Sequence, residues 1–166
     1  MLNTRRLFDG MLAVLLMMGL GLVATPAQAQ DNAFVGVSAV HIFVATTPDD
    51  DDAKCNVTKG GLDAAVRLPI DASRLRINPD ASPYVYVNAN VLMMPDGLCV
   101  ATFTVGLKRT LAIPGTNQLV FSATVWESAT STIWARSSIF WLQLNQSVSD
   151  FTKQLIAEWI KANPRR

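Results

Sequence analysis

The clearest pattern in the chain lies between residues 83 and 94. One alternating set of side chains there is apolar, and the other set is first aromatic and then mostly polar. A period of two is typical of a β-strand whose two faces meet different surroundings. The Asp96-Gly97 pair that follows is a strong hairpin signal, so we expect residues 98–109 to return as an antiparallel strand. A second turn at residues 114–117 predicts a third antiparallel strand over residues 119–126.

Further elements are predicted before this three-stranded meander. Residues 34–44 are rich in Val, Ile and Phe in both alternating sets, which predicts a strand buried on both faces. A polar, acidic loop is expected to follow, with four adjacent aspartates at residues 49–52. Apolar residues at helical spacing predict a short helix over residues 58–68, which Pro69 ends, and residues 75–77 then predict a short strand.

A long C-terminal helix is predicted from an amphipathic stripe that stops before Asn163-Pro164. The stripe consists of Trp141, Leu144, Val148, Phe151, Leu155 and Trp159. Residues 133–140 suit either a last short strand or the start of that helix. The whole pattern predicts an α+β fold, in which a single, largely antiparallel sheet carries a short helix and the long C-terminal helix on one face.

The first 29 residues have the three parts of a secretory signal peptide. Arg5 and Arg6 supply the basic start, residues 11–23 form an apolar run too short to span a bilayer, and Ala27-Gln28-Ala29 offers the small side chains that signal peptidases require. We therefore expect a signal peptide at residues 1–29 and a single mature α+β domain at residues 30–166, periplasmic or secreted. Residues 4–8 also match a twin-arginine signal in part, so that route stays open beside the general secretory one.

The charge of the mature chain is balanced. The whole chain has 14 basic and 13 acidic residues, and the signal peptide carries Arg5, Arg6 and Asp9, so 12 of each remain. This balance gives no electrostatic reason to expect nucleic acid or an anionic membrane surface as a partner. The mature chain has no second apolar run long enough to predict a membrane span.

Both cysteines, Cys55 and Cys99, lie in the mature chain. An even count in an oxidising compartment predicts a disulfide between them. Two buried free thiols and a metal pair are the alternatives. A metal pair is poorly supported, because the chain has a single histidine, His41, to complete a zinc site.

No motif in the chain commits to a reaction. The acidic run at residues 49–52 lacks the alternating ligand spacing and the glycine of a calcium loop, and Gly60-Gly61 lacks the lysine and the longer glycine pattern of a phosphate loop. His41 has no partner near it in sequence that would make it a general base. We therefore predict no catalytic residue, metal site or cofactor. A hydrolase whose site is assembled only in three dimensions around His41 remains an alternative.

One strand face offers the residues most suited to binding. Tyr84, Tyr86, Asn88 and Asn90 share it, and aromatic rings beside amides can stack on sugar rings or line a protein groove. Tyrosines that pack under a helix edge and asparagines that face water would give the same pattern. Trp126 and Trp134 flank a Ser/Thr-rich loop and complete the candidate binding residues, since interfaces favour Tyr and Trp.

Three segments of the chain together resemble a known group. They are Pro83-Tyr84-Val85-Tyr86-Val87-Asn88, Ala123-Thr124-Val125-Trp126, and a C-terminal helix that ends in Asn163-Pro164. In this order they resemble a group of small exported bacterial proteins of unknown function, over about residues 62–164. The resemblance implies a fold and no activity, and it brings no functional residues.

The sequence therefore favours an exported envelope protein that binds an unknown envelope protein or another envelope component, without catalysis. The alternative is a small-molecule or glycan-binding module that uses the face of Tyr84, Tyr86 and Asn88. An enzyme is less favoured than either.

Overall fold

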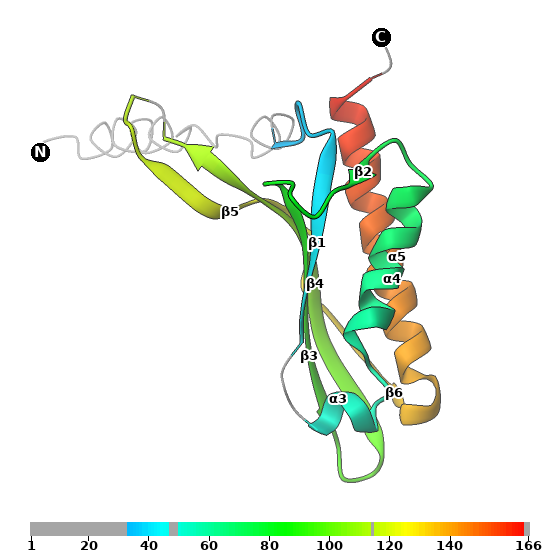
Figure 1. Cartoon of the computed structure of the whole chain (residues 1–166). Coiled ribbons are helices and arrows are strands. Elements are labelled where there is room, and N and C mark those ends of the chain that lie inside the picture. The colour runs from blue at the N-terminus through cyan, green and yellow to red at the C-terminus, as the bar shows by residue number, and fades with distance from the viewer. Residues whose placement is uncertain (1–32, 47–49, 114, 165–166) are drawn as a thin grey trace, which may run out of the picture.

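The computed structural model describes residues 33–46, 50–113 and 115–164, so the predicted signal peptide lies outside the described residues. The elements along the chain are β1 (Ala39–Thr46), α3 (Asp50–Lys54), α4 (Lys59–Asp71), β2 (Arg76–Ile77), β3 (Tyr84–Met93), β4 (Leu98–Ala112), β5 (Leu119–Glu127), β6 (Ser131–Arg136) and α5 (Ser137–Ala162). Figure 1 shows them with these labels. This order confirms the predicted α+β class.

The strands form one mixed sheet in the order β2-β1-β3-β4-β5, and β6 pairs with the first part of β4. β4 runs antiparallel to β3, β5 and β6, which confirms the predicted meander. β1 instead runs parallel to both β2 and β3. Parallel neighbours need a crossover connection, and the segment that contains α4 supplies it between β1 and β3.

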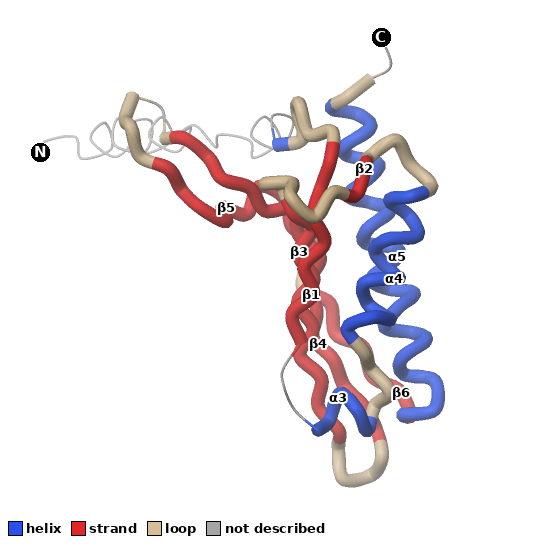
Figure 2. Tube along the Cα trace, in the orientation of Figure 1, coloured by secondary structure: helices blue, strands red, loops and turns tan. Residues whose placement is uncertain are grey.

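Helices α4 and α5 lie side by side on one face of this sheet (Figures 1 and 2). The core between helices and sheet contains, among others, Leu62, Val66 and Ile70 of α4, Phe140, Leu144 and Leu155 of α5, and Val85, Val87, Phe103 and Leu107 of the sheet. Each side chain of this size stabilises the fold by roughly 1.5–3 kcal/mol when fully buried. The predicted placement of both helices on one face is confirmed.

Helix α4 extends past the proline that was predicted to end it. Thr58 caps its start by accepting a hydrogen bond from the Gly61 N–H at 3.0 Å. Pro69 lies inside the helix, which continues to Asp71. The cost of the proline is offset because Ile70 is fully buried and the Ala72 N–H donates to the Leu68 carbonyl, which keeps the last turn closed.

The structure differs from the sequence prediction for the strand at residues 34–44 and for the acidic loop that follows it. β1 begins at Ala39 rather than at residue 34, and it is not buried on both faces, because Phe43 is 50% exposed on the side without helices. Three of the four adjacent aspartates form the start of α3, where the sequence predicted a loop. Carboxylates in a first helical turn are favoured by the helix dipole.

The structure also settles where the C-terminal helix begins, which the sequence left open over residues 133–140. Residues 131–136 form β6, and α5 begins directly after it at Ser137. This phase buries Phe140 completely and leaves Trp141 43% exposed, so the predicted stripe was wrong at its first position. From Leu144 onward the stripe faces the core, and Phe151 packs against Phe103 with ring centroids 5.5 Å apart.

The predicted disulfide is present. Cys55 and Cys99 are bonded with their Cα atoms 5.9 Å apart, and both are fully buried. The bond ties the chain just after α3 to the start of β4. Asp51 supports the same junction, because its Oδ2 accepts a hydrogen bond from the Met93 N–H at 3.1 Å.

Candidate functional site

The face of the sheet opposite α4 and α5 carries no helix within the described ranges, and we call it the open face (Figures 1 and 2). The strand register decides which side chains lie there. Tyr84 and Tyr86 of β3 pair with His41 and Phe43 of β1, and paired residues of neighbouring strands project to the same face. On the other side of β3, Tyr84 pairs with Lys108 of β4.

An aromatic cluster of Phe43, Tyr84 and Tyr86 occupies one end of the open face. Phe43 and Tyr86 stack with centroids 5.8 Å apart and planes at 17°, and Tyr84 meets both rings edge-on. The Lys108 ammonium lies 3.9 Å from the Tyr86 centroid, a cation–π contact. Because β1 and β4 flank β3 on opposite sides, Phe43 and Lys108 approach Tyr86 from opposite sides. Both flat sides of the Tyr86 ring are therefore occupied.

His41 completes an open, largely apolar hollow of about 300 Å³ with these three aromatic residues. A hydrolytic site there would need a serine or carboxylate in contact with the imidazole. In the part of the chain that the structure describes, no such residue is hydrogen-bonded to His41, and the residues that share the hollow with it are aromatic. The geometry gives the hydrolase alternative no support.

Polar rows lie in the middle of the open face. Asn88 pairs with Thr104, and Asn90 pairs with Thr102 on the neighbouring strand. The structure thus brings four of the predicted binding residues together on one exposed or partly exposed face: Tyr84, Tyr86, Asn88 and Asn90. The tyrosines do not pack under a helix edge, because the helices cover the other side of the sheet.

An apolar row lies at the far end of the open face. Leu92 pairs with Val100, and Val100 pairs with Trp134 of β6, so the three side chains form one line across three strands. Trp134 is 70% exposed and Leu92 54% exposed. At about 3.3 Å per residue, the six residues from Tyr86 to Leu92 place this row about 20 Å from the aromatic cluster.

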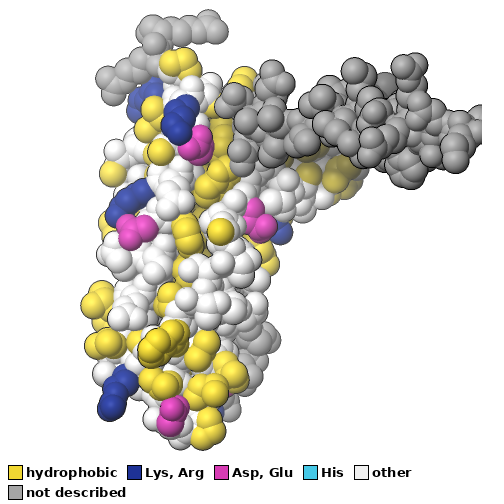
Figure 3. Space-filling model, turned by 180° about the vertical axis from the view of Figure 1, so that it is seen from behind, with side chains coloured by type: hydrophobic (Ala, Val, Ile, Leu, Met, Phe, Trp, Pro, Cys, Tyr) yellow, Lys and Arg dark blue, Asp and Glu magenta, His cyan; other side chains and the backbone are white. Residues whose placement is uncertain are grey.

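Hydrophobic side chains continue from this row around the end of the molecule. Figure 3 shows them gathered at the lower end in that view, and the exposed hydrophobic residues of this region include Trp134 of β6 and Ile139, Trp141 and Leu142 of α5. Isolated exposed apolar residues are ordinary, whereas a contiguous exposed group is typical of interaction surfaces, so this end of the molecule is a candidate for one.

The structure places Trp126 away from the other candidate residues. It pairs with Leu107 on the helix-covered face, is only 8% exposed, and packs against Phe34 with centroids 6.3 Å apart. Its position at the end of a predicted strand, just before a polar loop, gave no sign of this burial. Sequence reasoning also missed Phe43, Leu92 and Lys108. The alternation along each strand showed which residues share a face, but it did not show which face of the sheet the helices cover.

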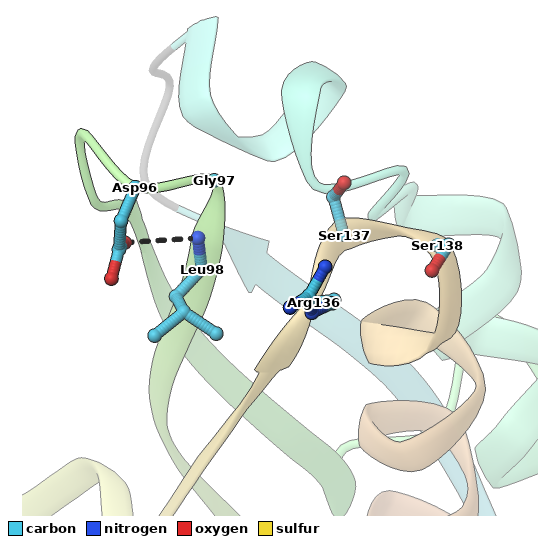
Figure 4. Close-up of a pocket in the computed structure, with 6 residues that line it drawn as sticks. All are labelled: Asp96, Gly97, Leu98, Arg136, Ser137 and Ser138. Carbon is cyan, nitrogen blue, oxygen red and sulfur yellow. Dashed lines mark hydrogen bonds between the residues drawn. The ribbon is translucent and has the colours of Figure 1, made fainter.

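A second hollow, of about 500 Å³, lies between the β3–β4 turn and the start of α5. Figure 4 shows Asp96, Gly97 and Leu98 on one side of it and Arg136, Ser137 and Ser138 on the other. The Asp96 carboxylate accepts a hydrogen bond from the Leu98 N–H at 3.2 Å, and this bond stabilises the β3–β4 turn. The described residues contain no group of three or more His, Cys, Asp or Glu that could hold a metal ion.

Similarity to known proteins is weak. No family model matches the chain, and no curated protein matches it. A PelC dodecamer from Paraburkholderia phytofirmans is 20% identical over 72% of this chain and 86% of that chain, with a TM-score of 0.40. Rare lipoprotein B from Shewanella oneidensis is 12% identical over 74% of this chain and 92% of that chain, with a TM-score of 0.27. TM-scores this low carry no argument about function.

Proposed function

We propose that this chain is an exported, non-enzymatic binding protein of the bacterial envelope, and that its open face docks a protein partner. The observation that carries the proposal is the open face itself, which bears exposed large apolar side chains at both ends and no covering helix in the described ranges. Phe43 and Trp134, 50% and 70% exposed, are the anchors, since aromatic side chains are enriched among the few residues that supply most of the binding energy of an interface.

The dimensions of the face suit a protein. A span of about 20 Å between the aromatic cluster and the apolar row fits an interface of standard size, which buries about 800 Å² on each partner. The rows of Asn88, Asn90, Thr102 and Thr104 lie between the anchors and supply hydrogen-bond donors and acceptors. A protein interface combines apolar contacts with direct hydrogen bonds, and this face offers groups for both.

A glycan would have to stack on Tyr84 or on the half-exposed ring of Phe43 rather than on Tyr86. A sugar ring stacks on the flat side of an aromatic ring, and both sides of Tyr86 are occupied by Phe43 and Lys108.

The envelope location rests on the signal peptide predicted at residues 1–29, and the buried Cys55–Cys99 disulfide is compatible with an oxidising compartment. No helix of the described ranges is both long and apolar enough to cross a bilayer.

The test is a crosslinked pull-down of the tagged full chain from its native envelope, read by quantitative mass spectrometry. Phe43→Ser and Trp134→Ser are compared with Leu68→Ser, which removes an apolar residue as exposed as Trp134 (both 70%) and more exposed than Phe43 (50%) from α4 on the opposite side of the sheet. Loss of a hot-spot contact of about 2 kcal/mol lowers affinity about thirtyfold, so the partner should disappear from both open-face variants and persist with Leu68→Ser.

Two outcomes would contradict the proposal. A partner retained equally by all three variants places the docking surface elsewhere. A glycan titration that changes the tryptophan fluorescence of the purified protein, and that Tyr84→Ala abolishes with folding intact, would favour the glycan alternative instead.

A further inference from the structure

A two-stranded arm extends from the body of the sheet, away from α4 and α5 (Figures 1 and 2). It consists of the end of β4 and the start of β5, residues 110–113 and 115–123, joined by a turn in which the Ile113 N–H donates to the Gln118 carbonyl. The strand register shifts twice at its base, and Ser122 adopts a positive φ of 57°. Such irregularities bend and twist a strand pair, which explains why the arm leaves the plane of the sheet.

The arm exposes apolar side chains and carries no charge. Leu111, Ile113, Leu119, Val120 and Phe121 are between 37% and 72% exposed. Residues 110–126 contain no Asp, Glu, Lys or Arg. The nearest cations, Lys108 and Arg109, are held within the molecule by the Tyr86 ring and the Ala33 carbonyl.

This composition is unusual for a strand edge in water. β5 ends the sheet, and its outer edge pairs with no other strand of the described chain. Proteins that stay monomeric protect such edges with charged side chains or prolines on the edge strand, because unpaired N–H and C=O groups recruit other strands. β5 has no charged residue and no proline along its exposed part, residues 119–123, and the irregularity at Ser122 is the protection that it does have.

We propose that the arm pairs with the arm of a second copy of this chain, β5 against β5 in antiparallel orientation, with Phe121 beside its counterpart at the two-fold axis. An isologous contact places identical segments against each other, and like charges directly opposite are destabilising. A segment free of charge therefore meets its own copy without repulsion. The projection of the arm away from the helices leaves room for the second body.

A strand partner fits this edge better than lipid does. Hydrocarbon cannot satisfy the backbone N–H and C=O groups of an open strand edge, whereas an antiparallel strand satisfies those on either side of the irregularity at Ser122. The contact area of two short strands is small, so we expect a dissociation constant on the order of 10 μM. The inference is independent of the proposed docking face, and Phe43→Ser is expected to leave this dimer intact.

The experiment is sedimentation velocity of the mature chain over a concentration series, with Phe121→Lys, Phe121→Glu and Leu68→Lys as variants. Phe121 and Leu68 are 72% and 70% exposed, so the control introduces the same charge at equal exposure on α4. The wild type and Leu68→Lys should dimerise. Each Phe121 variant alone should dimerise at least tenfold more weakly, and an equimolar mixture of Phe121→Lys and Phe121→Glu should recover the dimer, since opposite charges then meet.

Circular dichroism of each variant shows whether it is folded, and Leu119→Lys repeats the test at a second position of the same strand. A wild type that stays monomeric up to about 100 μM overturns the proposal. So does a Phe121→Lys variant that dimerises like the wild type. Flotation of a monomer with phosphatidylethanolamine–phosphatidylglycerol vesicles, lost in Phe121→Lys, would assign the arm to a lipid surface instead.

Discussion

Removal of the Cys55–Cys99 disulfide by the double substitution Cys55→Ala and Cys99→Ala is expected to destabilise the protein strongly. The bond joins residues 44 positions apart, and the loop it closes contains α4, β2 and β3. In the chain-entropy description, a closed loop of this length restricts the unfolded state enough to contribute about 4 kcal/mol to the free energy of unfolding. That is a large share of the roughly 5–15 kcal/mol by which a domain of this size is stable.

The native structure should survive the substitution. Both cysteines are fully buried at a junction that also contains the hydrogen bond from the Met93 N–H to Asp51, which stays in place. The predicted loss therefore comes mainly from the unfolded chain, with a smaller contribution in the same direction from the space that each missing sulfur leaves.

Urea unfolding followed by tryptophan fluorescence measures this loss. The oxidised wild type is compared with the double variant and with wild type reduced by a thiol-free reductant. The reduced wild type should lose somewhat less stability than the double variant, because it keeps both sulfur atoms. The denaturant dependence of the free energy should also rise without the bond, because the unfolded chain then exposes more surface. A loss below about 1 kcal/mol, with the double variant folded, would refute the chain-entropy account for this loop.

Three further substitutions test local features of the fold. The Met93 N–H and then the Lys54 ammonium hold the pKa of Asp51 below its ordinary value of 3.8, so its contribution to stability is complete above that value and is lost as the pH falls through the folded pKa. Thermal unfolding should therefore show Asp51→Asn to be less stable than wild type near neutral pH and the gap to close in acid; a gap independent of pH would contradict this. Gly97→Ala should cost about 1 kcal/mol, because Gly97 has φ +80°, whereas Gly60→Ala in α4, with open space around the new methyl group, should stabilise by about 0.5–1 kcal/mol in the same urea assay.

Local signals in the sequence predicted most of the elements. The period-two alternation of residues 83–94 with the Asp96-Gly97 turn placed the central hairpin, and the stripe before Asn163-Pro164 placed the C-terminal helix. These signals work because they depend on neighbours a few residues away. They fail where contacts with distant residues decide the local structure. Pro69 was predicted to end the helix, but it lies inside α4, because burial of Ile70 in the core keeps the last turn closed.

The boundary between β6 and α5 also could not be predicted from local signals, and it decides which residues of this region are exposed. Residues 133–140 have a composition that suits a strand or a helix, and only pairing of residues 131–136 with β4 settles where the strand ends. That pairing also fixes the phase of α5, which buries Phe140 and exposes Trp141. A shift of one residue in a helix turns a side chain by about 100°, enough to move it out of the core.

The sequence by itself determined which side chains share a face, namely Tyr84 with Tyr86, Asn88 and Asn90, and it determined that Cys55 and Cys99 had a reason to pair. The tertiary structure alone decided that the two helices cover the opposite face, that Phe43 and Lys108 flank Tyr86, and that Trp126 is buried against Phe34. The physical reason is that side-chain period is a property of one strand, whereas exposure depends on strand register and on which layer packs against the sheet.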